Sequence, residues 1–355
     1  MKKRTLLVIL ALVLGLSYLL MWPVEVDPQL WYPPAAPTLS EAPYQANEAL
    51  TAATWLETEP FGVGPEDVAV DSIGRIYGGL LNGIILRYQP DGSKPEIFAE
   101  TNGRPLGMTF DKEENLIVAD AIRGLLSVDR IGQITVLATS AGGEVLHFTD
   151  DLDIAEDGKI YFSDASSRFG VHNWRNDLLE HRGNGRLLVY DPATKTTEVL
   201  LSDLYFANGV AVSADQQSIL FNETAKYRVR RYWLSGPKAG TAEVWIDNLP
   251  GFPDNLSRGS EGIYWVAIPS PRNSMLDHLL PKPFLRKVVH RLPEAVQPNP
   301  TRYGMVLGLD ETGQVRHNLQ ATDGDIAFIT SVKEVNGTLY LGSLEEPRIG
   351  ILARP

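Results

Sequence analysis

Short runs of alternating or β-branched apolar residues recur from about residue 55 onward, and turn residues separate them. The turns include Asp71-Ser72-Ile73-Gly74, Pro90-Asp91-Gly92, Glu156-Asp157-Gly158 and Asn336-Gly337. This pattern is typical of β-hairpins, and little helical periodicity lies between the runs. The sequence therefore predicts an all-β domain over residues 55–355.

One motif repeats six times within this domain. A second strand of one type follows the opening in several units, as in Leu116–Asp120 and Ile160–Asp164. The opening residues of the six units are Glu66, Leu106, Asp150, Asn208, Asp254 and Thr330. Three of the intervals between them are 40, 44 and 46 residues long, which is typical of propeller blades of about four strands. We predict a six-bladed β-propeller in which the segment near Trp55 and Leu56 supplies the outer strand of the last blade; a β-sandwich would not repeat one motif in this way.

The two longest units predict short helical insertions, at Asn173–His181 in the third unit and Ser274–Pro293 in the fifth. The second insertion combines apolar residues with the basic or titratable residues Lys282, Arg286, Lys287, His290 and Arg291. It would form an amphipathic basic helix that lies against anionic lipid, or a solvated lid helix over one face of the disc. The sequence leaves these two alternatives open.

The N-terminal segment predicts where the protein is located. Basic residues at positions 2–4 precede an uncharged run, Thr5–Trp22, whose 18 residues are enough to cross a bilayer as a helix. We predict a signal anchor over residues 1–22 in a single-pass membrane protein, with the propeller on the periplasmic or extracytoplasmic side. A cleaved signal peptide is the alternative, but no small-x-small cleavage site precedes Pro23. Residues 23–54 are rich in proline and predict an extended linker.

Composition narrows the classes of function. The 44 acidic and 32 basic residues give a net charge of −12, which argues against a nucleic-acid partner, because binding phosphates requires clustered Lys and Arg. The chain has no cysteine, which excludes disulfides, thiolate metal sites and a cysteine nucleophile. No Gly-x-Ser-x-Gly motif occurs, and Ser163 and Ser257 lack an evident triad, so a serine hydrolase is disfavoured.

The opening positions of the repeat hold the candidate chemistry. The innermost strand of each propeller blade runs along the central channel, so equivalent positions meet around one axis. Glu66, Asp150, Asn208 and Asp254 would then point at one spot at the end of the channel. Converging carboxylates repel one another and are costly to bury, and a divalent cation removes that cost. The all-oxygen ligand set favours Ca2+, with magnesium, manganese and zinc as alternatives.

Four motifs carry a resemblance to the strictosidine synthase-like family: Phe206–Ser213, Phe252–Leu256, Gly103–Gly107 and Leu339–Ser343. The chain most resembles the adipocyte plasma membrane-associated protein group of that family, which also has an N-terminal anchor. The resemblance covers roughly residues 55–353. It implies a place in the superfamily of gluconolactonases and paraoxonases, six-bladed propellers that hydrolyse lactones and esters with a divalent metal bound in the channel.

The resemblance also implies roles for individual residues. The metal-binding Glu, Asn, Asn and Asp of that superfamily match, in order, Glu66, Asp150, Asn208 and Asp254. Asn255 stands beside the last of them, and Asp150 adds a charge where relatives usually carry Asn. Thr330 stands where the plant alkaloid synthases place a catalytic Glu, which argues against strictosidine synthase activity. Leu106 stands where paraoxonases have a histidine.

These observations predict a membrane-anchored, metal-dependent hydrolase of small lactones or (aryl)esters. Asp254 would orient or deprotonate the attacking water, and Asn208 and Asn255 would form hydrogen bonds at the rim of the metal. His147 would be a proton shuttle or a strand-end histidine with a satisfied hydrogen bond. Aromatic residues at the openings and insertions would line a substrate pocket or pack between blades: Phe148, Phe169, Trp174, Phe206, Phe252 and Phe328. The alternative function is a non-catalytic, membrane-tethered binding propeller with a structural metal.

Overall fold

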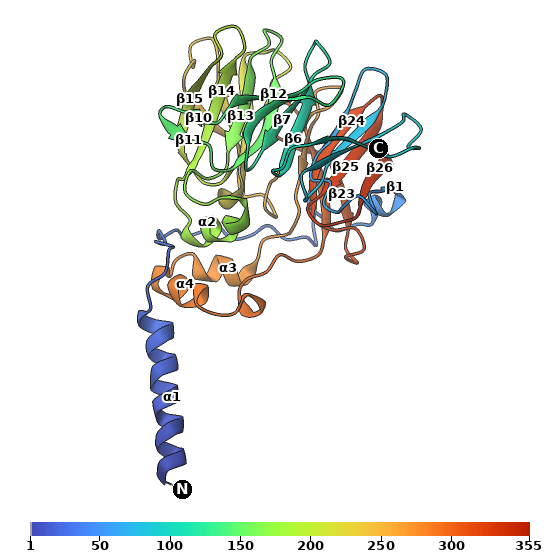
Figure 1. Ribbon diagram of the computed structural model, residues 1–355. Coiled ribbons are helices and arrows are strands. Elements are labelled where there is room, and N and C mark those ends of the chain that lie inside the picture. The colour runs from blue at the N-terminus through green and yellow to red at the C-terminus, as the bar shows by residue number, and fades with distance from the viewer. Residues whose placement is uncertain (1) are drawn as a thin grey trace.

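The computed structural model describes residues 2–355, and these form six four-stranded antiparallel sheets arranged as the blades of a propeller (Figure 1). The predicted fold class is therefore confirmed. Strand order follows the chain within each of the first five blades, so the first strand of each blade is innermost and borders the central channel.

The first three blades are built from the N-terminal half of the chain. The first contains β2 (Val68–Val70), β3 (Ile76–Gly79), β4 (Ile84–Tyr88) and β5 (Glu96–Glu100). The second contains β6 (Pro105–Phe110), β7 (Leu116–Asp120), β8 (Gly124–Val128) and β9 (Ile134–Ala138), and the small hairpin β10 (Ser140–Ala141) and β11 (Glu144–Val145) follows it. The third contains β12 (Thr149–Ile154), β13 (Ile160–Asp164), β14 (Gly185–Asp191) and β15 (Thr196–Leu204).

The remaining blades follow the same plan. The fourth contains β16 (Ala207–Val212), β17 (Ser218–Glu223), β18 (Arg228–Trp233) and β19 (Ala242–Ile246). The fifth contains β20 (Leu256–Arg258), β21 (Tyr264–Ala267), β22 (Gly304–Leu309) and β23 (Val315–Ala321). The sixth contains β24 (Ile329–Val335), β25 (Thr338–Ser343) and β26 (Arg348–Ala353), with β1 (Thr54–Glu57) as its outer strand.

Local chemistry fixes the hairpins that connect the first two strands of a blade. The side chain of Asp71 accepts hydrogen bonds from the backbone N–H of Ile73 (3.2 Å) and Arg75 (2.8 Å), and Gly74 supplies the positive φ of 89° that the turn requires. Asp111 repeats this arrangement in the second blade. Apolar side chains from the strands then pack between neighbouring blades, which gives one core layer for each pair of blades.

The last blade combines the two ends of the propeller sequence. β1 pairs antiparallel with β26, with Thr54 opposite Ile351 and Glu57 opposite Arg348. The prediction that the segment near Trp55 and Leu56 completes the last blade is therefore confirmed. This pairing joins the first and last blades into a closed ring.

Both predicted insertions are helical, and both lie at one end of the ring. The first, with η2 (Val171–Asn173) and α2 (Trp174–Glu180), connects β13 to β14. The second, with α3 (Ser274–Leu279), α4 (Pro283–His290) and η4 (Glu294–Val296), connects β21 to β22. Because each insertion follows the second strand of its blade, it lies at the end of the channel where the innermost strands begin (Figure 1).

The N-terminal helix α1 (Lys2–Met21) projects away from the propeller on the side of these insertions (Figure 1). Within residues 2–355 it is the one helix that is long and apolar enough to cross a membrane, and its side chains are not buried against the propeller. The predicted anchor thus has a structural counterpart in α1, which could serve as a membrane anchor.

The proline-rich segment after α1 lies on the propeller as a strap, which we define as residues 26–48. The backbone N–H of Gln29 donates to the carbonyl of Glu180 (2.8 Å), and Trp31 stacks on His181 at 4.4 Å between ring centroids. Farther along, Asn47 accepts a hydrogen bond from the backbone N–H of Gln320 (3.0 Å). The strap is extended, as predicted for the linker, but it packs along the blades; η1 (Ala49–Ala52) then leads into β1.

Arg286 joins the strap to both insertions. Its side chain is fully buried and donates to the carbonyls of Leu179 (2.7 Å), Glu180 (3.3 Å) and Leu280 (3.0 Å), and also to that of Gln29. The structure therefore modifies the picture of a basic amphipathic helix, because the central cation of α4 faces inward and binds backbone carbonyls. Isolated buried cations are costly, so the stability of this one depends on the carbonyls that its two terminal nitrogens bind.

We predict that Arg286→Leu lowers the free energy of unfolding by about 3 kcal/mol or more, because several buried carbonyls lose their donor. Lys287→Leu is the matched control: Lys287 forms a partly exposed ion pair with Asp27, and its loss should cost less than about 1 kcal/mol. Chemical denaturation and proteolysis of the strap would measure both variants. Equal effects of the two substitutions would show that Arg286 does not hold the strap in place.

Candidate metal centre

Four side chains from the openings of four blades meet at the channel end covered by the helical insertions. Glu66 precedes β2, Asp150 lies in β12, Asn208 lies in β16 and Asp254 precedes β20. One carboxylate oxygen from each of Glu66, Asp150 and Asp254 lies within 4.8 Å of the other two. Glu66, Asp150 and Asn208 are buried, whereas Asp254 is partly exposed. The structure therefore brings together the residues that the repeat predicts as ligands.

Irregularities in the innermost strands aim these side chains. The register between β12 and β13 shifts between Thr149 and Leu152, and that between β16 and β17 shifts between Ala207 and Val210. Such bulges re-aim side chains at the ends of strands. Gly209 belongs to the same arrangement, because a Cβ atom there would lie 2.4 Å from the carbonyl oxygen of Asp254. Glycine is therefore needed at position 209 because two blades approach closely there, and Asn208-Gly209 does not form a turn.

Two amides orient the carboxylates and keep their own oxygens free. Nδ2 of Asn208 donates to Oδ1 of Asp254 (2.6 Å), and Nδ2 of Asn255 donates to the carboxylate of Glu66 (3.2 and 3.3 Å). In the part of the chain that the structure describes, Oδ1 of Asn208 and Oδ1 of Asn255 are buried without a hydrogen-bond partner. Buried polar atoms normally have partners, so these two oxygens indicate a ligand.

Burial and mutual repulsion disfavour ionisation of the three carboxylates. Burial raises the pKa of Glu66 well above its usual value, and the charges of Asp254 and Asp150 raise it further. The pKa of Asp150 is likewise raised, by burial and then by the charge of Asp254. Burial raises the pKa of Asp254 to about 7, although the hydrogen bond from Asn208 acts in the opposite direction. Three such groups ionise together at neutral pH only if a positive charge compensates them.

Arg104 supplies part of that compensation, and sequence reasoning did not select it as a site residue. Its buried guanidinium lowers the pKa of both Glu66 and Asp150, although less than burial raises them. Nη1 donates to the carbonyls of Gly64 (2.9 Å) and Gly79 (3.3 Å). Among residues 2–355, Nη2 finds no acceptor. The position of Arg104 at the opening of the second blade is the signal that could have identified it.

The donor set fits a divalent cation. Three carboxylates and two free amide oxygens are hard ligands, and no imidazole or thiolate is among them. Glu66, Asp150, Asn208 and Asp254 would hold the cation, with Asn255 as a further oxygen donor. Ca2+ suits such a set best because it accepts oxygen ligands in variable number.

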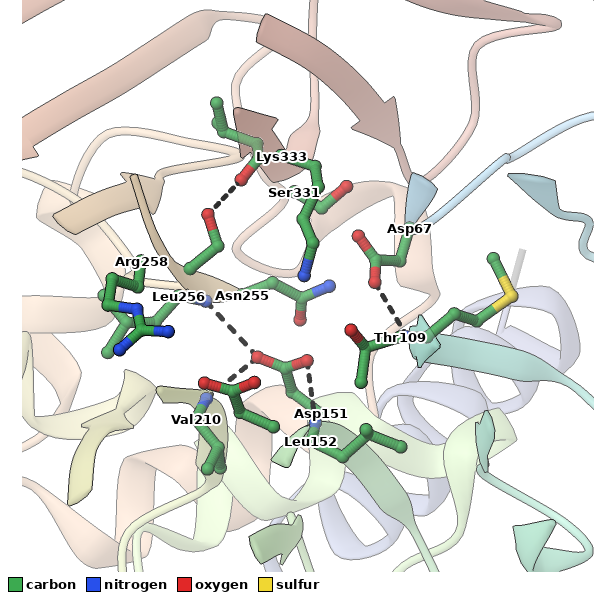
Figure 2. A pocket seen from close by; sticks show the side chains of 14 residues that line it. Asp67, Thr109, Asp151, Leu152, Val210, Asn255, Leu256, Arg258, Ser331 and Lys333 are labelled. Atoms are coloured by element: carbon green, nitrogen blue, oxygen red, sulfur yellow. Dashed lines mark hydrogen bonds between the residues drawn. The ribbon is translucent and has the colours of Figure 1, made fainter. Parts of the chain in front are cut away.

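A second layer of carboxylates lies deeper in the channel and borders a cavity of about 210 Å3 (Figure 2). Asp67 accepts a hydrogen bond from the backbone N–H of Met108 (2.8 Å). Asp151 accepts from Val210 (2.8 Å) and Leu256 (3.3 Å). Each carboxylate therefore ties its own innermost strand to those of other blades. Sequence reasoning missed this layer, although each residue directly follows a predicted ligand.

The other residues named in the sequence analysis mainly contribute to packing and to hydrogen bonds within the fold. Thr330 is buried and donates its hydroxyl to the carbonyl of Glu66 (2.6 Å). Leu106 belongs to an apolar cluster with Phe148 and Phe206, whose rings meet edge to face at 5.5 Å. For these two aromatics the structure therefore shows the packing role. His147 donates its backbone N–H to Asp164 (3.1 Å), and within residues 2–355 its side chain has no hydrogen bond to the predicted ligands.

Sequence relatives identify the family. A model of strictosidine synthase matches residues 150–237, and a model of the N-terminal region of strictosidine synthase-like proteins matches residues 42–88. The adipocyte plasma membrane-associated protein of Salmo salar is 36% identical over 338 residues, which cover 88% of this chain and 80% of that protein. The chain belongs to the strictosidine synthase-like family. Protein Strictosidine synthase-like 13 of Arabidopsis thaliana is 37% identical and covers 82% of this chain and 78% of its own length.

The fold of this strictosidine synthase-like chain is also similar to those of other propellers whose structures have been solved. A gluconolactonase of Xanthomonas campestris superimposes with a TM-score of 0.62 at 17% identity, and covers 94% of this chain and 99% of its own. Regucalcin, a calcium-binding protein of Agrobacterium tumefaciens, superimposes with a TM-score of 0.58 at 15% identity, covering 85% of this chain and 93% of its own. At these identities the similarity shows the shared fold.

We predict that the metal-free protein loses stability as the pH rises from about 5 to about 7.5. The folded protein retains carboxyl protons, up to the Asp254 pKa of about 7, that the unfolded chain releases near pH 4. The melting temperature in chelator should therefore fall across this range. Saturating calcium should reduce the fall, although burial also raises the pKa of Asp177, outside the cluster, to about 7.

One substitution distinguishes the repulsion among the buried carboxylates from their role as metal ligands. Asp150→Asn should raise the melting temperature in chelator at about pH 7.5, because one buried charge is removed. It should also reduce the stabilisation by calcium, because a ligand charge is lost. Asp157→Asn, an exposed turn residue, is the control. A lower melting temperature of Asp150→Asn in chelator would contradict the electrostatic account.

Proposed function

We propose that this protein is a membrane-anchored hydrolase of small lactones or esters that depends on a divalent cation, with Ca2+ as the expected ion. The observation that carries the proposal is the convergence of three carboxylates at the channel end, two of which are each bound by an amide whose own oxygen has no partner among residues 2–355. The shared fold with a gluconolactonase supports the reaction class, and the shared fold with the calcium-binding regucalcin supports the ion. The propeller would lie on the extracytoplasmic side, since basic residues precede α1.

The chemistry needs a polarised carbonyl and an activated water. A divalent cation, when bound, supplies Lewis-acid polarisation of the scissile carbonyl. Asp254 is the partly exposed member of the cluster, and Oδ1 accepts the hydrogen bond from Asn208, which fixes the orientation of the carboxylate. Its other oxygen, Oδ2, can accept the proton of an attacking water. A bound cation would lower the pKa of Asp254 below the value of about 7 that burial gives it.

Neighbouring residues bear on the choice of reaction. Thr330 presents a hydroxyl already engaged with the carbonyl of Glu66, so it cannot replace the carboxylate that an amine–aldehyde condensation requires. Hydrolysis instead uses the carboxylate of Asp254, and the buried guanidinium of Arg104 adds positive charge near the carboxylates. These features support ester or lactone hydrolysis over condensation.

The test is hydrolysis of phenyl acetate and a panel of lactones by the full chain in detergent, with calcium or with chelator. We predict that chelator abolishes activity and that Asp254→Asn lowers kcat by about 100-fold or more, the usual contribution of a general base. Asp157→Asn should retain full activity, because that side chain lies in an exposed turn. The calcium-dependent rise in melting temperature serves as the check on folding.

Two results would contradict the proposal. Full activity of Asp254→Asn would remove this residue from the chemistry. Failure of the unmodified protein to hydrolyse any substrate, together with a large stabilisation by calcium, would indicate a binding propeller whose metal is structural.

A further inference from the structure

Apolar side chains are exposed at the channel end that carries the helical insertions. On α4, Phe284 is 56% exposed and Leu285 is 42% exposed, and Met275 of α3 is 52% exposed. The segment that connects α1 to the strap and the strap itself add Trp22, Leu30 and Tyr32, which are also exposed. Large apolar residues gathered on one surface mark a contact with a partner or a membrane. We call this set the apolar rim.

The second insertion is bound directly to the end of α1. Arg291, which follows α4, donates through Nε to the carbonyl of Trp22 (2.7 Å) and through Nη1 to that of Leu19 (2.8 Å). These carbonyls belong to the last turn of α1 and the residue after it, where a helix accepts cations favourably. Lys287 on α4 adds an ion pair with Asp27 at 3.1 Å. The apolar rim is therefore held where α1 ends.

The charges around the apolar rim are mostly paired. Asp27 binds Arg182 (2.5 Å) as well as Lys287, and Glu294 forms an ion pair with Arg175. With Arg286 buried and Arg291 engaged by the end of α1, few cations remain free to attract anionic lipid. Binding of this surface therefore depends on its apolar side chains.

We propose that the apolar rim lies in the surface of the same bilayer that α1 crosses, so that the channel end with the carboxylate cluster faces the lipid. The occupant follows from geometry: α1 projects on this side of the propeller, so the bilayer that contains α1 lies next to α3 and α4 (Figure 1). Aromatic and aliphatic side chains at helix ends are typical of such interfacial contacts. A second copy of the chain would have to fit between the propeller and that bilayer.

This orientation defines a class of substrate. A site whose mouth faces the lipid surface receives molecules that partition into the interface, so the expected substrate is an amphiphilic ester or lactone carried by the membrane. This part of the inference rests on the proposed function, whereas the orientation rests only on α1 being a membrane anchor.

The orientation is tested by site-specific labelling, which the absence of native cysteine makes simple. An environment-sensitive fluorophore is attached to Phe284→Cys or Leu285→Cys in the full chain, reconstituted in phosphatidylcholine nanodiscs with or without spin-labelled lipid. Ile131→Cys is the matched control: Ile131 is 77% exposed in the turn between β8 and β9, at the opposite end of the ring. Leu12→Cys within α1 reports insertion of the anchor.

We expect spin-labelled lipid to quench the labels at 284 and 285 at least about twofold more strongly than the label at 131, with phosphatidylcholine alone sufficient. Equal, weak quenching at 284, 285 and 131, with strong quenching at 12, would overturn the orientation while leaving the anchor intact. A blue-shifted label at 284 that lipid does not quench would identify a protein partner and would also overturn it. No quenching at 12 would refute the anchor itself. None of these outcomes depends on hydrolysis.

Activity then tests the substrate class. Phe284→Asp should reduce hydrolysis of a long-chain ester embedded in vesicles severalfold and leave hydrolysis of phenyl acetate unchanged, because the site itself is intact. Equal loss on both substrates would contradict a role in access from the membrane. No hydrolysis of either substrate by the unmodified protein would count against the proposed function and the substrate class, but not against the labelled orientation.

Discussion

The pairing of β1 with β26 closes the ring, and the arrangement at the channel end depends on that closure. The sixth blade lies between the fifth and the first, and its Thr330 bridges them. The carbonyl of Thr330 accepts the backbone N–H of Asn255 (3.0 Å), and its hydroxyl donates to the carbonyl of Glu66 (2.6 Å). The ring therefore fixes the separation of Glu66 and Asp254. These carboxylates are close because six blades leave a narrow channel, not because either attracts the other.

Approximate free energies indicate what the cluster of three carboxylates requires to be stable. A hydrogen bond to a charged group contributes roughly 1.5–3 kcal/mol, whereas burying one ion costs several kcal/mol. The donations from Asn208 and Asn255 therefore do not offset the burial of three carboxylates, and Arg104 contributes one positive charge against three negative ones. Protonation or a bound divalent cation must supply the rest. Each of the two amides also leaves a buried oxygen without a hydrogen-bond partner among residues 2–355, which favours the cation near neutral pH.

The sequence predicts much of the fold and of the candidate site, because both depend on a repeated local pattern. Each blade opens with the same motif, so the register that defines the blades also predicts which side chains meet at the axis. Asp151 of the second layer was missed because a bulge breaks the alternation of β12, so Asp151 faces inward like Asp150 before it. Adjacent residues in a regular strand would point to opposite faces.

The strap and its attachment could not be predicted for a different reason. The strap has no periodicity, and many of its contacts use backbone groups, as in the donation from Arg286 to the carbonyl of Gln29. Every residue has a backbone carbonyl, so contacts through carbonyls do not depend on residue type. The proline content therefore predicted only an extended linker. The basic residues of α4 looked like a surface for lipid, yet Arg286 points into the protein.

The pairing of β1 with β26 also determines when the last blade can form during synthesis of the chain. Among residues 2–355, β1 is the first strand in chain order and β26 the last, so β1 has no partner strand until the sixth blade has been synthesised. Contacts between residues so far apart in the chain form slowly, and an unpaired strand edge can pair incorrectly or aggregate before its partner is available. The strap contacts α2, α4 and the fifth blade, all of which follow β1 in the chain, so β1 lacks both its partner strand and a fixed strap until those segments are present.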